Sequence, residues 1–245
     1  MNSKEILAII VLVFTIFACS LSDMSSLLPQ SISVSGNAIT REEAITDFDS
    51  VDVSASFEVQ IQQADEYQVI LRVDDNLEEY LQVEKAGNTL KIGLKPNLSI
   101  QGSATLEAKI MMPELVGIDL SGASNANISG FSSSQNLVLD LSGSSSLKGD
   151  IEVGDASMDI SGSSDIYLSG TGGNLILDAS GSSEVDLSEF QVKDANLDVS
   201  GASSVTVNPG GILNVIASGA SEVFYLGDPT FGRVDTSGSS NIQAR

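Results

Sequence analysis

The sequence has no histidine and no tryptophan, and its 245 residues include a single cysteine. Without histidine there is no imidazole acid or base, no histidine-based triad and no histidine metal ligand. One cysteine excludes an internal disulfide and a cysteine-rich zinc site. Only 11 lysines and arginines stand against 33 acidic residues, which gives a formal charge of −22. Such a chain repels phosphates, and this argues against a nucleic-acid partner.

An apolar run near the N-terminus, residues 6–18, follows a short polar segment that contains Lys4. The run is shorter than the ~20 residues that a helix needs to cross a bilayer, and it suits a secretory signal peptide better. It ends at Ile16-Phe17-Ala18-Cys19, which resembles the lipobox of bacterial lipoproteins. We therefore expect residues 1–18 to be a lipoprotein signal peptide and Cys19 to carry a lipid anchor to the membrane.

The residues after the cysteine favour an outer-membrane location. Ser20 stands where an Asp would indicate retention in the inner membrane, by resemblance to the enterobacterial sorting rule. The face of the membrane, periplasmic or cell-surface, is left open. Residues 19–36 are rich in serine and lack sustained periodicity, so we expect a flexible tether there.

A tetrapeptide repeat dominates the rest of the chain. Ser-Gly-(Ala/Ser)-Ser occurs seven times, at spacings of 21, 19, 19, 20, 18 and 19 residues. The copies start at Ser121, Ser142, Ser161, Ser180, Ser200, Ser218 and Ser237. Apolar residues alternate with polar ones on both sides of most copies, which is typical of strands with one buried face. Each repeat is therefore a strand, a tight corner, a second strand and a loop.

A unit of about 19 residues with two short strands cannot bury its own apolar face, but identical units stacked in parallel can. The sequence thus predicts an all-β protein, a single-stranded parallel β-helix or β-solenoid. An antiparallel sandwich also has short strands at close intervals, but it does not need the same four residues at every other corner. We assign the repeat β-helix to residues 119–245. Residues 37–118 keep the β pattern without the Ser-Gly corner, as an irregular region that caps the solenoid or as a separate small β-domain.

The corner residues have structural roles that the repeat explains. Glycine at the second position allows the bend a positive φ without Cβ strain. These glycines are Gly122, Gly143, Gly162, Gly181, Gly201, Gly219 and Gly238. The last serine of each copy is expected to point inward, where its hydroxyl can pair with corner backbone groups and with the hydroxyls of neighbouring corners.

Aspartate lies two residues before the first serine in six of the seven copies, and Ile216 takes its place in the remaining one. The six are Asp119, Asp140, Asp159, Asp178, Asp198 and Asp235. Stacked coils would bring these carboxylates into a ladder about 4.8 Å apart. One interpretation is a solvated acidic stripe; the other is a candidate cation ladder, with Ca²⁺ as the ion that carboxylate oxygens favour. No other cofactor is indicated.

Two aromatic residues and the last coil suggest contacts with partners. Tyr167 and Phe224 fall at outward-facing strand positions, where they are candidate ligand contacts, for instance by stacking on sugar rings. A solenoid end exposes unpaired strand edges. We therefore expect either a homo-oligomer formed through the C-terminal solenoid edge or an edge covered by loop 227–233.

Together these features resemble the bacterial family described as putative auto-transporter adhesin, head GIN domain. The resemblance extends from about Ile39 to the C-terminus and rests on Phe48-Asp49-Ser50-Val51-Asp52-Val53, on the strand at 57–62 and on the Ser-Gly-Ser corners. It implies a right-handed, pectin-lyase-like β-helix that is secreted or lipid-anchored in Bacteroidetes, with an adhesion role and no catalytic residues to carry over.

The functional expectation is a lipid-anchored cell-envelope protein with a non-enzymatic, adhesion-like role toward a glycan or another host or cell-surface ligand. A polysaccharide lyase-like β-helix enzyme is one alternative, although fold alone does not confer that activity. A ligand-free envelope scaffold or regulatory component is the other.

Overall fold

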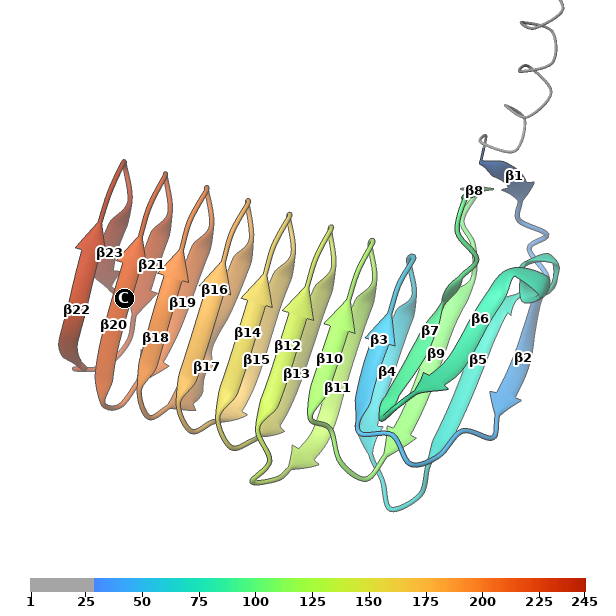
Figure 1. Ribbon diagram of the computed structural model, residues 1–245, viewed down its shortest axis with the longest axis horizontal. Coiled ribbons are helices and arrows are strands. Elements are labelled where there is room, and N and C mark those ends of the chain that lie inside the picture. Colours follow the sequence, from blue (N-terminus) through green and yellow to red (C-terminus); the bar gives the residue numbers. More distant parts are fainter. Residues whose placement is uncertain (1–28) are drawn as a thin grey trace, which may run out of the picture.

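The computed structural model describes residues 29–245 and is almost entirely β-structure, with parallel coils stacked into a β-solenoid (Figure 1). Each coil places one strand in a ten-stranded sheet and the next strand in an eleven-stranded sheet. Within the repeat region every strand pair is parallel, as stacked coils require. The solenoid predicted from the repeat is confirmed.

In spatial order, the ten-stranded sheet consists of β22 (Thr230–Thr236), β20 (Ile212–Ala217), β18 (Ala195–Val199), β16 (Leu175–Ala179), β14 (Ala156–Ile160), β12 (Leu137–Leu141), β10 (Gly117–Leu120), β3 (Ser50–Val53), β7 (Thr89–Leu94) and β6 (Leu81–Ala86). The eleven-stranded sheet follows in the same way: β2 (Ala38–Glu43), β5 (Gln68–Asp74), β9 (Leu106–Met112), β4 (Glu58–Gln63), β11 (Asn125–Ser132), β13 (Ser146–Glu152), β15 (Asp165–Thr171), β17 (Glu184–Val192), β19 (Ser204–Pro209), β21 (Glu222–Tyr225) and β23 (Asn241–Ala244).

The core is the space between the two sheets. Strands such as β12, β14, β16 and β18 alternate strictly between buried and exposed positions. Their inward side chains join those of the facing sheet in one continuous apolar cluster along the stack. Phe131 of β11 and Phe190 of β17 are also buried in this cluster. Burial of this stripe is what a single coil could not achieve alone.

The corners of successive coils stack directly on one another. The amide of Ser163 donates to the carbonyl of Gly143, and that of Ser182 donates to the carbonyl of Gly162, both at 2.8 Å. The corner glycines have φ between +72° and +77°. A Cβ on Gly181 would lie 2.3 Å from the Gly162 carbonyl oxygen, so the stacking as well as the φ angle requires glycine here.

The last serine of each corner points inward, as predicted. In six copies it is buried, and in most copies its hydroxyl donates to the carbonyl of the first serine of the same corner. The Ser183 hydroxyl, for example, donates to the Ser180 carbonyl at 2.8 Å. Hydroxyl-to-hydroxyl bonds between corners were also expected, but within residues 29–245 none joins two corner serines. Neighbouring corners bond through backbone donors instead: the Ser145 and Ser183 amides donate to the hydroxyls of Ser164 and Ser203.

An additional coil precedes the repeats. β3 and β4 pair in parallel with β10 and β11, so that Asp52 lies beside Asp119 and Val53 beside Leu120. The corner between them is Ser54-Ala55-Ser56-Phe57, with Ala55 at φ +77°. This coil was not predicted from the repeat, because alanine replaces the glycine and phenylalanine replaces the last serine.

The N-terminal end of the stack is built from antiparallel pairs. β6 pairs with β7, and β5 pairs with both β2 and β9. The short 3-10 helix η2 (Asp75–Tyr80) links β5 to β6. Residues 30–33, which the sequence analysis assigns to a tether, instead form β1 (Gln30–Ser33), paired in parallel with β8 (Leu98–Gln101).

The C-terminal coil consists of β22 and β23, the outermost strands of the two sheets. The prediction that loop 227–233 covers this edge is wrong, because residues 230–233 belong to β22 itself. All seven residues of β22 are exposed, among them Phe231 and Val234. Self-association through this edge stays a prediction.

Candidate functional site

The aspartates form a column on the outer face of the ten-stranded sheet. Strand register places Asp119, Asp140, Asp159, Asp178 and Asp198 directly beside one another, in that order. Asp235 is separated from Asp198 by Ile216, and it pairs with Arg233 at 2.6 Å. The register also adds Asp52 at the other end of the column, where Lys91 binds it at 2.6 Å.

Partial burial, together with neighbouring like charges, raises the pKa of three carboxyls in this column above the ordinary range. Partial burial is the main cause at Asp119, Asp140 and Asp178, and the charges of neighbouring aspartates add to it. At Asp119 those neighbours are Asp52 and Asp140. The column is thus a line of like charges held together by the fold.

The column does not present the ligand geometry of a metal site. In residues 29–245 no group of three or more Asp, Glu or Cys side chains converges where it could hold a metal ion. Strand stacking spreads the carboxylates along a line, whereas Ca²⁺ needs six to eight oxygens around one point.

The two aromatic candidates share one row on the outer face of the eleven-stranded sheet, but they do not meet. Register places Asp186 and Thr206 between Tyr167 and Phe224. The Lys148 ammonium lies 5.1 Å from the centroid of the Tyr167 ring, and the Arg245 guanidinium lies 6.0 Å from that of Phe224. Both rings are half-buried, so each offers a small contact surface.

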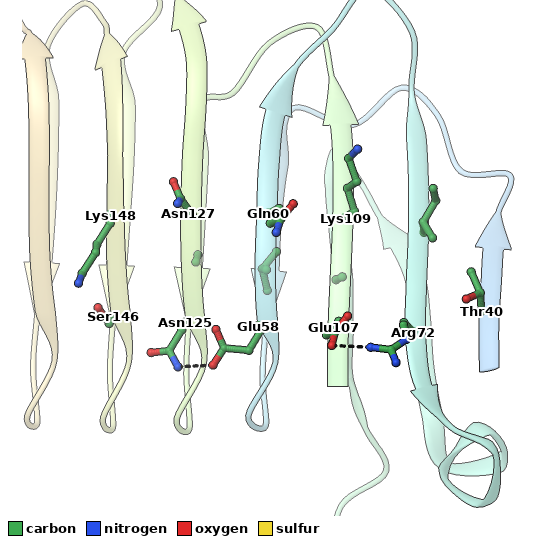
Figure 2. A pocket seen from close by; sticks show the side chains of 14 residues that line it. Thr40, Glu58, Gln60, Arg72, Glu107, Lys109, Asn125, Asn127, Ser146 and Lys148 are labelled. Atoms are coloured by element: carbon green, nitrogen blue, oxygen red, sulfur yellow. Dashed lines mark hydrogen bonds and ion pairs between the residues drawn. The ribbon is translucent and has the colours of Figure 1, made fainter. Parts of the chain in front are cut away.

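The same row continues toward the N-terminal end and enters a groove. The groove has a volume of about 680 Å³ and lies across β2, β5, β9, β4, β11 and β13. Strand register aligns Lys109, Gln60, Asn127 and Lys148 as consecutive members of the row. Figure 2 shows these four side chains on neighbouring strands, above a second row that contains Glu107, Glu58, Asn125 and Ser146.

Contacts within the groove involve mainly the second row. Arg72 binds Glu107 at 2.8 Å, and the Asn125 amide donates to Glu58 at 2.7 Å. No sequence motif marks this site, because its residues come from non-adjacent segments. The alternation of inward and outward strand positions that identifies Tyr167 as outward-facing also applies to Lys148 and Asn127. Gln60 and Lys109 are placed beside them only by the pairing of β4 with β9.

The model of one protein family covers most of this chain. It is described as putative auto-transporter adhesin, head GIN domain, and it matches residues 47–229. The chain belongs to this family. No match is found among curated proteins.

Solved structures share the fold of this family member at low sequence identity. A putative adhesin from Bacteroides fragilis is 19% identical, with a TM-score of 0.82 over 87% of this chain and 100% of that chain. A putative lipid binding protein from Parabacteroides distasonis is 24% identical, with a TM-score of 0.70 over 88% and 100%. A putative adhesin from Parabacteroides merdae is 18% identical, with a TM-score of 0.66 over 88% and 99%. At these identities the likeness establishes the fold.

The candidate lipid anchor, Cys19, lies outside the described residues. Within residues 29–245 no helix is long and apolar enough to cross a membrane. Membership in an adhesin-like family indicates a protein of the cell envelope or surface.

Proposed function

We propose that this chain is a cell-envelope protein with a non-enzymatic, adhesion-like binding role, held at the outer membrane by a lipid on Cys19. Membership in the head GIN domain family and solved neighbours named as putative adhesins support the binding role. The lipobox-like Ile16-Phe17-Ala18-Cys19 supports the anchor. Two chains or more of lipid give stable anchoring, which one chain does not.

The observation that carries the binding role is the groove on the eleven-stranded sheet (Figure 2). Its donors and acceptors lie on strands, so their spacing is fixed by backbone hydrogen bonds rather than by loops. A rigid row of outward polar side chains suits an extended ligand such as a glycan chain, because little conformational entropy is lost when it binds.

The groove favours binding over catalysis. A glycosidase needs two carboxyl groups on either side of the bond that it cleaves. The two groove carboxylates, Glu58 and Glu107, lie side by side on β4 and β9 and are engaged by Asn125 and Arg72. We expect no release of reducing or unsaturated ends when the protein is incubated with a glycan panel and Ca²⁺. Sustained release that is lost with Lys109→Gln would favour the lyase alternative.

Protease digestion of intact cells tests the location and the anchor together. Wild type is expected to be degraded by added protease and to fractionate with the outer membrane, whereas Cys19→Ala is expected to leave the membrane fraction. Degradation only after lysis would place the protein in the periplasm and favour the envelope scaffold. Unchanged membrane fractionation of Cys19→Ala would contradict the lipid anchor.

Adhesion itself is tested with cells that carry wild type or lack the protein. Cells with the protein are expected to bind glycan-coated or matrix-coated surfaces more strongly, and purified protein is expected to compete with them. Equal attachment of the two strains to every surface in the panel would overturn the binding role.

A further inference from the structure

The groove on the eleven-stranded sheet contains an unusual run of four side chains. Lys109, Gln60, Asn127 and Lys148 lie on β9, β4, β11 and β13, and each is the register partner of the next. All four are exposed. With strands about 4.8 Å apart, the two lysines lie about 14 Å from each other, with the two amides between them.

Among the described residues, the polar side chains of this row have no hydrogen-bonded or ionic side-chain partner, whereas the two carboxylates of the second row each have one. Arg72 and Asn125 engage the two groove carboxylates, Glu107 and Glu58. Within residues 29–245, the ammonium groups of Lys109 and Lys148 form no salt bridge and the amides of Gln60 and Asn127 form no side-chain hydrogen bond. The side chains that line the groove comprise three basic residues, Arg72, Lys109 and Lys148, against the two carboxylates of Glu58 and Glu107, so the groove is weakly positive although the whole chain carries −22.

The order of these groups matches one kind of ligand. An amide both donates and accepts, as pairing with sugar hydroxyls requires, and an ammonium group donates to a carboxylate through a charge-assisted bond. A chain of linked pyranose rings advances by roughly one strand spacing per ring, so it can follow the row from strand to strand. The Tyr167 ring, capped on one side by Lys148, continues the row beyond the groove.

We propose that this groove binds an oligosaccharide that bears carboxylates, a uronic-acid glycan, with its carboxylates on Lys109 and Lys148 and its hydroxyls on Gln60 and Asn127. This inference rests on the proposed binding role and names its ligand class. The net charge of the protein repels such a ligand at long range, but salt screens that repulsion beyond about 8 Å at physiological ionic strength, and the contacts in the groove lie within that distance. Val59, which is buried, and Ile70 are the larger apolar side chains among the residues that line the groove, and the absence of an exposed apolar cluster among these lining residues disfavours a membrane surface as the ligand.

The test measures binding of the full chain to an oligogalacturonate of four to eight sugars by titration calorimetry. The matched probe is the same oligosaccharide with its carboxyl groups methyl-esterified, which keeps the sugar and removes the charge. We expect the methyl ester to bind at least tenfold more weakly. Equal affinity for the two probes, or no binding of the acidic one, would overturn the proposal.

Variants locate the site. Lys109→Gln and Lys148→Gln are each expected to weaken binding of the oligogalacturonate about fivefold to tenfold, somewhat less than the loss of a buried charge-assisted bond because both lysines are exposed. The double variant is expected to weaken it further, and Lys109→Arg to retain most of it. Lys85→Gln is the matched control, because Lys85 is an exposed lysine on β6 outside the groove. An unchanged affinity in the double variant would overturn the assignment to this groove.

Two further outcomes separate this inference from the proposed function. Binding to vesicles of anionic phospholipid that is lost with the double variant, without binding of oligogalacturonate, would assign the groove to a lipid surface and overturn the glycan. Cell attachment that survives the double variant would leave the adhesion-like role in place while removing the groove from it.

Discussion

The first coil and the later coils turn the same corner with different residues. Every copy of the repeat has glycine at the second corner position, with φ near +75°, whereas the first coil has Ala55 there at φ +77°. The backbone conformation is the same, so φ alone does not explain why the repeats always use glycine. The difference lies in what each corner faces.

A Cβ at a corner glycine would point at the preceding coil. On Gly122 it would lie 2.4 Å from the Ala55 carbonyl oxygen, and on Gly143 it would lie 2.4 Å from that of Gly122. Ala55 has no corner before it, because its neighbour β7 forms an antiparallel pair with β6 instead. Stacking thus excludes a side chain at every corner except the first.

Replacing a central corner glycine should break the stack most severely. Gly181→Ala adds the cost of a positive φ and a Cβ 2.3 Å from the Gly162 carbonyl oxygen. We expect a loss of about 3 kcal/mol or more in the free energy of unfolding, measured by urea denaturation.

The matched control is Gly87→Ala, at φ +62° with no other atom within 4 Å of the added Cβ. It should cost only the conformational part, about 1 kcal/mol. Equal losses of unfolding free energy at Gly181 and Gly87 would show that contact between coils is not the reason why every repeat corner has glycine at its second position.

The last corner serine distinguishes the coils in a second way. Ser183 is buried and donates to the Ser180 carbonyl, whereas the first coil has the fully buried Phe57 at this position. Ser183→Ala leaves that carbonyl without its donor, so we expect a loss of about 1.5 kcal/mol. The exposed Ser182 is the matched control, and Ser182→Ala should change stability by less than about 0.5 kcal/mol. Thermal unfolding of the two variants would contradict this if their midpoints shifted equally.

Ala55 itself offers a gain rather than a loss. Ala55→Gly removes the strain of a positive φ at a residue with a Cβ, and part of this benefit is offset by the greater freedom of glycine in the unfolded chain. We expect a net stabilisation of about 0.5 kcal/mol by urea denaturation. A destabilisation would show that the Ala55 Cβ makes a packing contact worth more than the strain.

The sequence predicted the repeating part of the fold well, because the spacing of Ser-Gly corners and the alternation of apolar residues are local signals. It predicted the serine orientation and the aspartate column for the same reason. The coil formed by β3 and β4 was missed, since Ala55 and Phe57 remove its two marker residues. Stacking constraints are weaker at the first coil, so its sequence is freer to vary.

The groove was harder to predict than the coils. Lys148 and Asn127 occupy outward positions of regular coils, so the alternation of apolar and polar residues predicts that they face solvent. Gln60 and Lys109 come next to them only because β9 pairs in parallel with β4 while also pairing antiparallel with β5. No local sequence pattern predicts that β9 pairs in parallel with one neighbour and antiparallel with the other.

An equally small effect is expected in the aspartate column, whose ends are paired with basic residues while its middle is crowded with like charges. Burial and the charge of Asp159 raise the pKa of Asp140, so the folded state binds that proton more tightly than the unfolded state. The contribution of Asp140 to stability therefore falls as pH rises through the window between the ordinary carboxyl pKa and the raised value. Asp140→Asn should stabilise the protein at neutral pH by about 0.5 kcal/mol, because like charges directly opposite on neighbouring strands are unfavourable.

This gain should fade as the pH is lowered, because the wild-type carboxyl then becomes neutral, and it should shrink at high salt. Thermal unfolding of both proteins across acidic and neutral pH measures it. Asp235→Asn is the control, since Ile216 separates Asp235 from the column and Arg233 pairs with it, so that variant should give no gain. A gain at Asp235 equal to that at Asp140 would mean that the net charge of the whole chain, rather than the stacking of neighbouring carboxylates, sets the cost of the column.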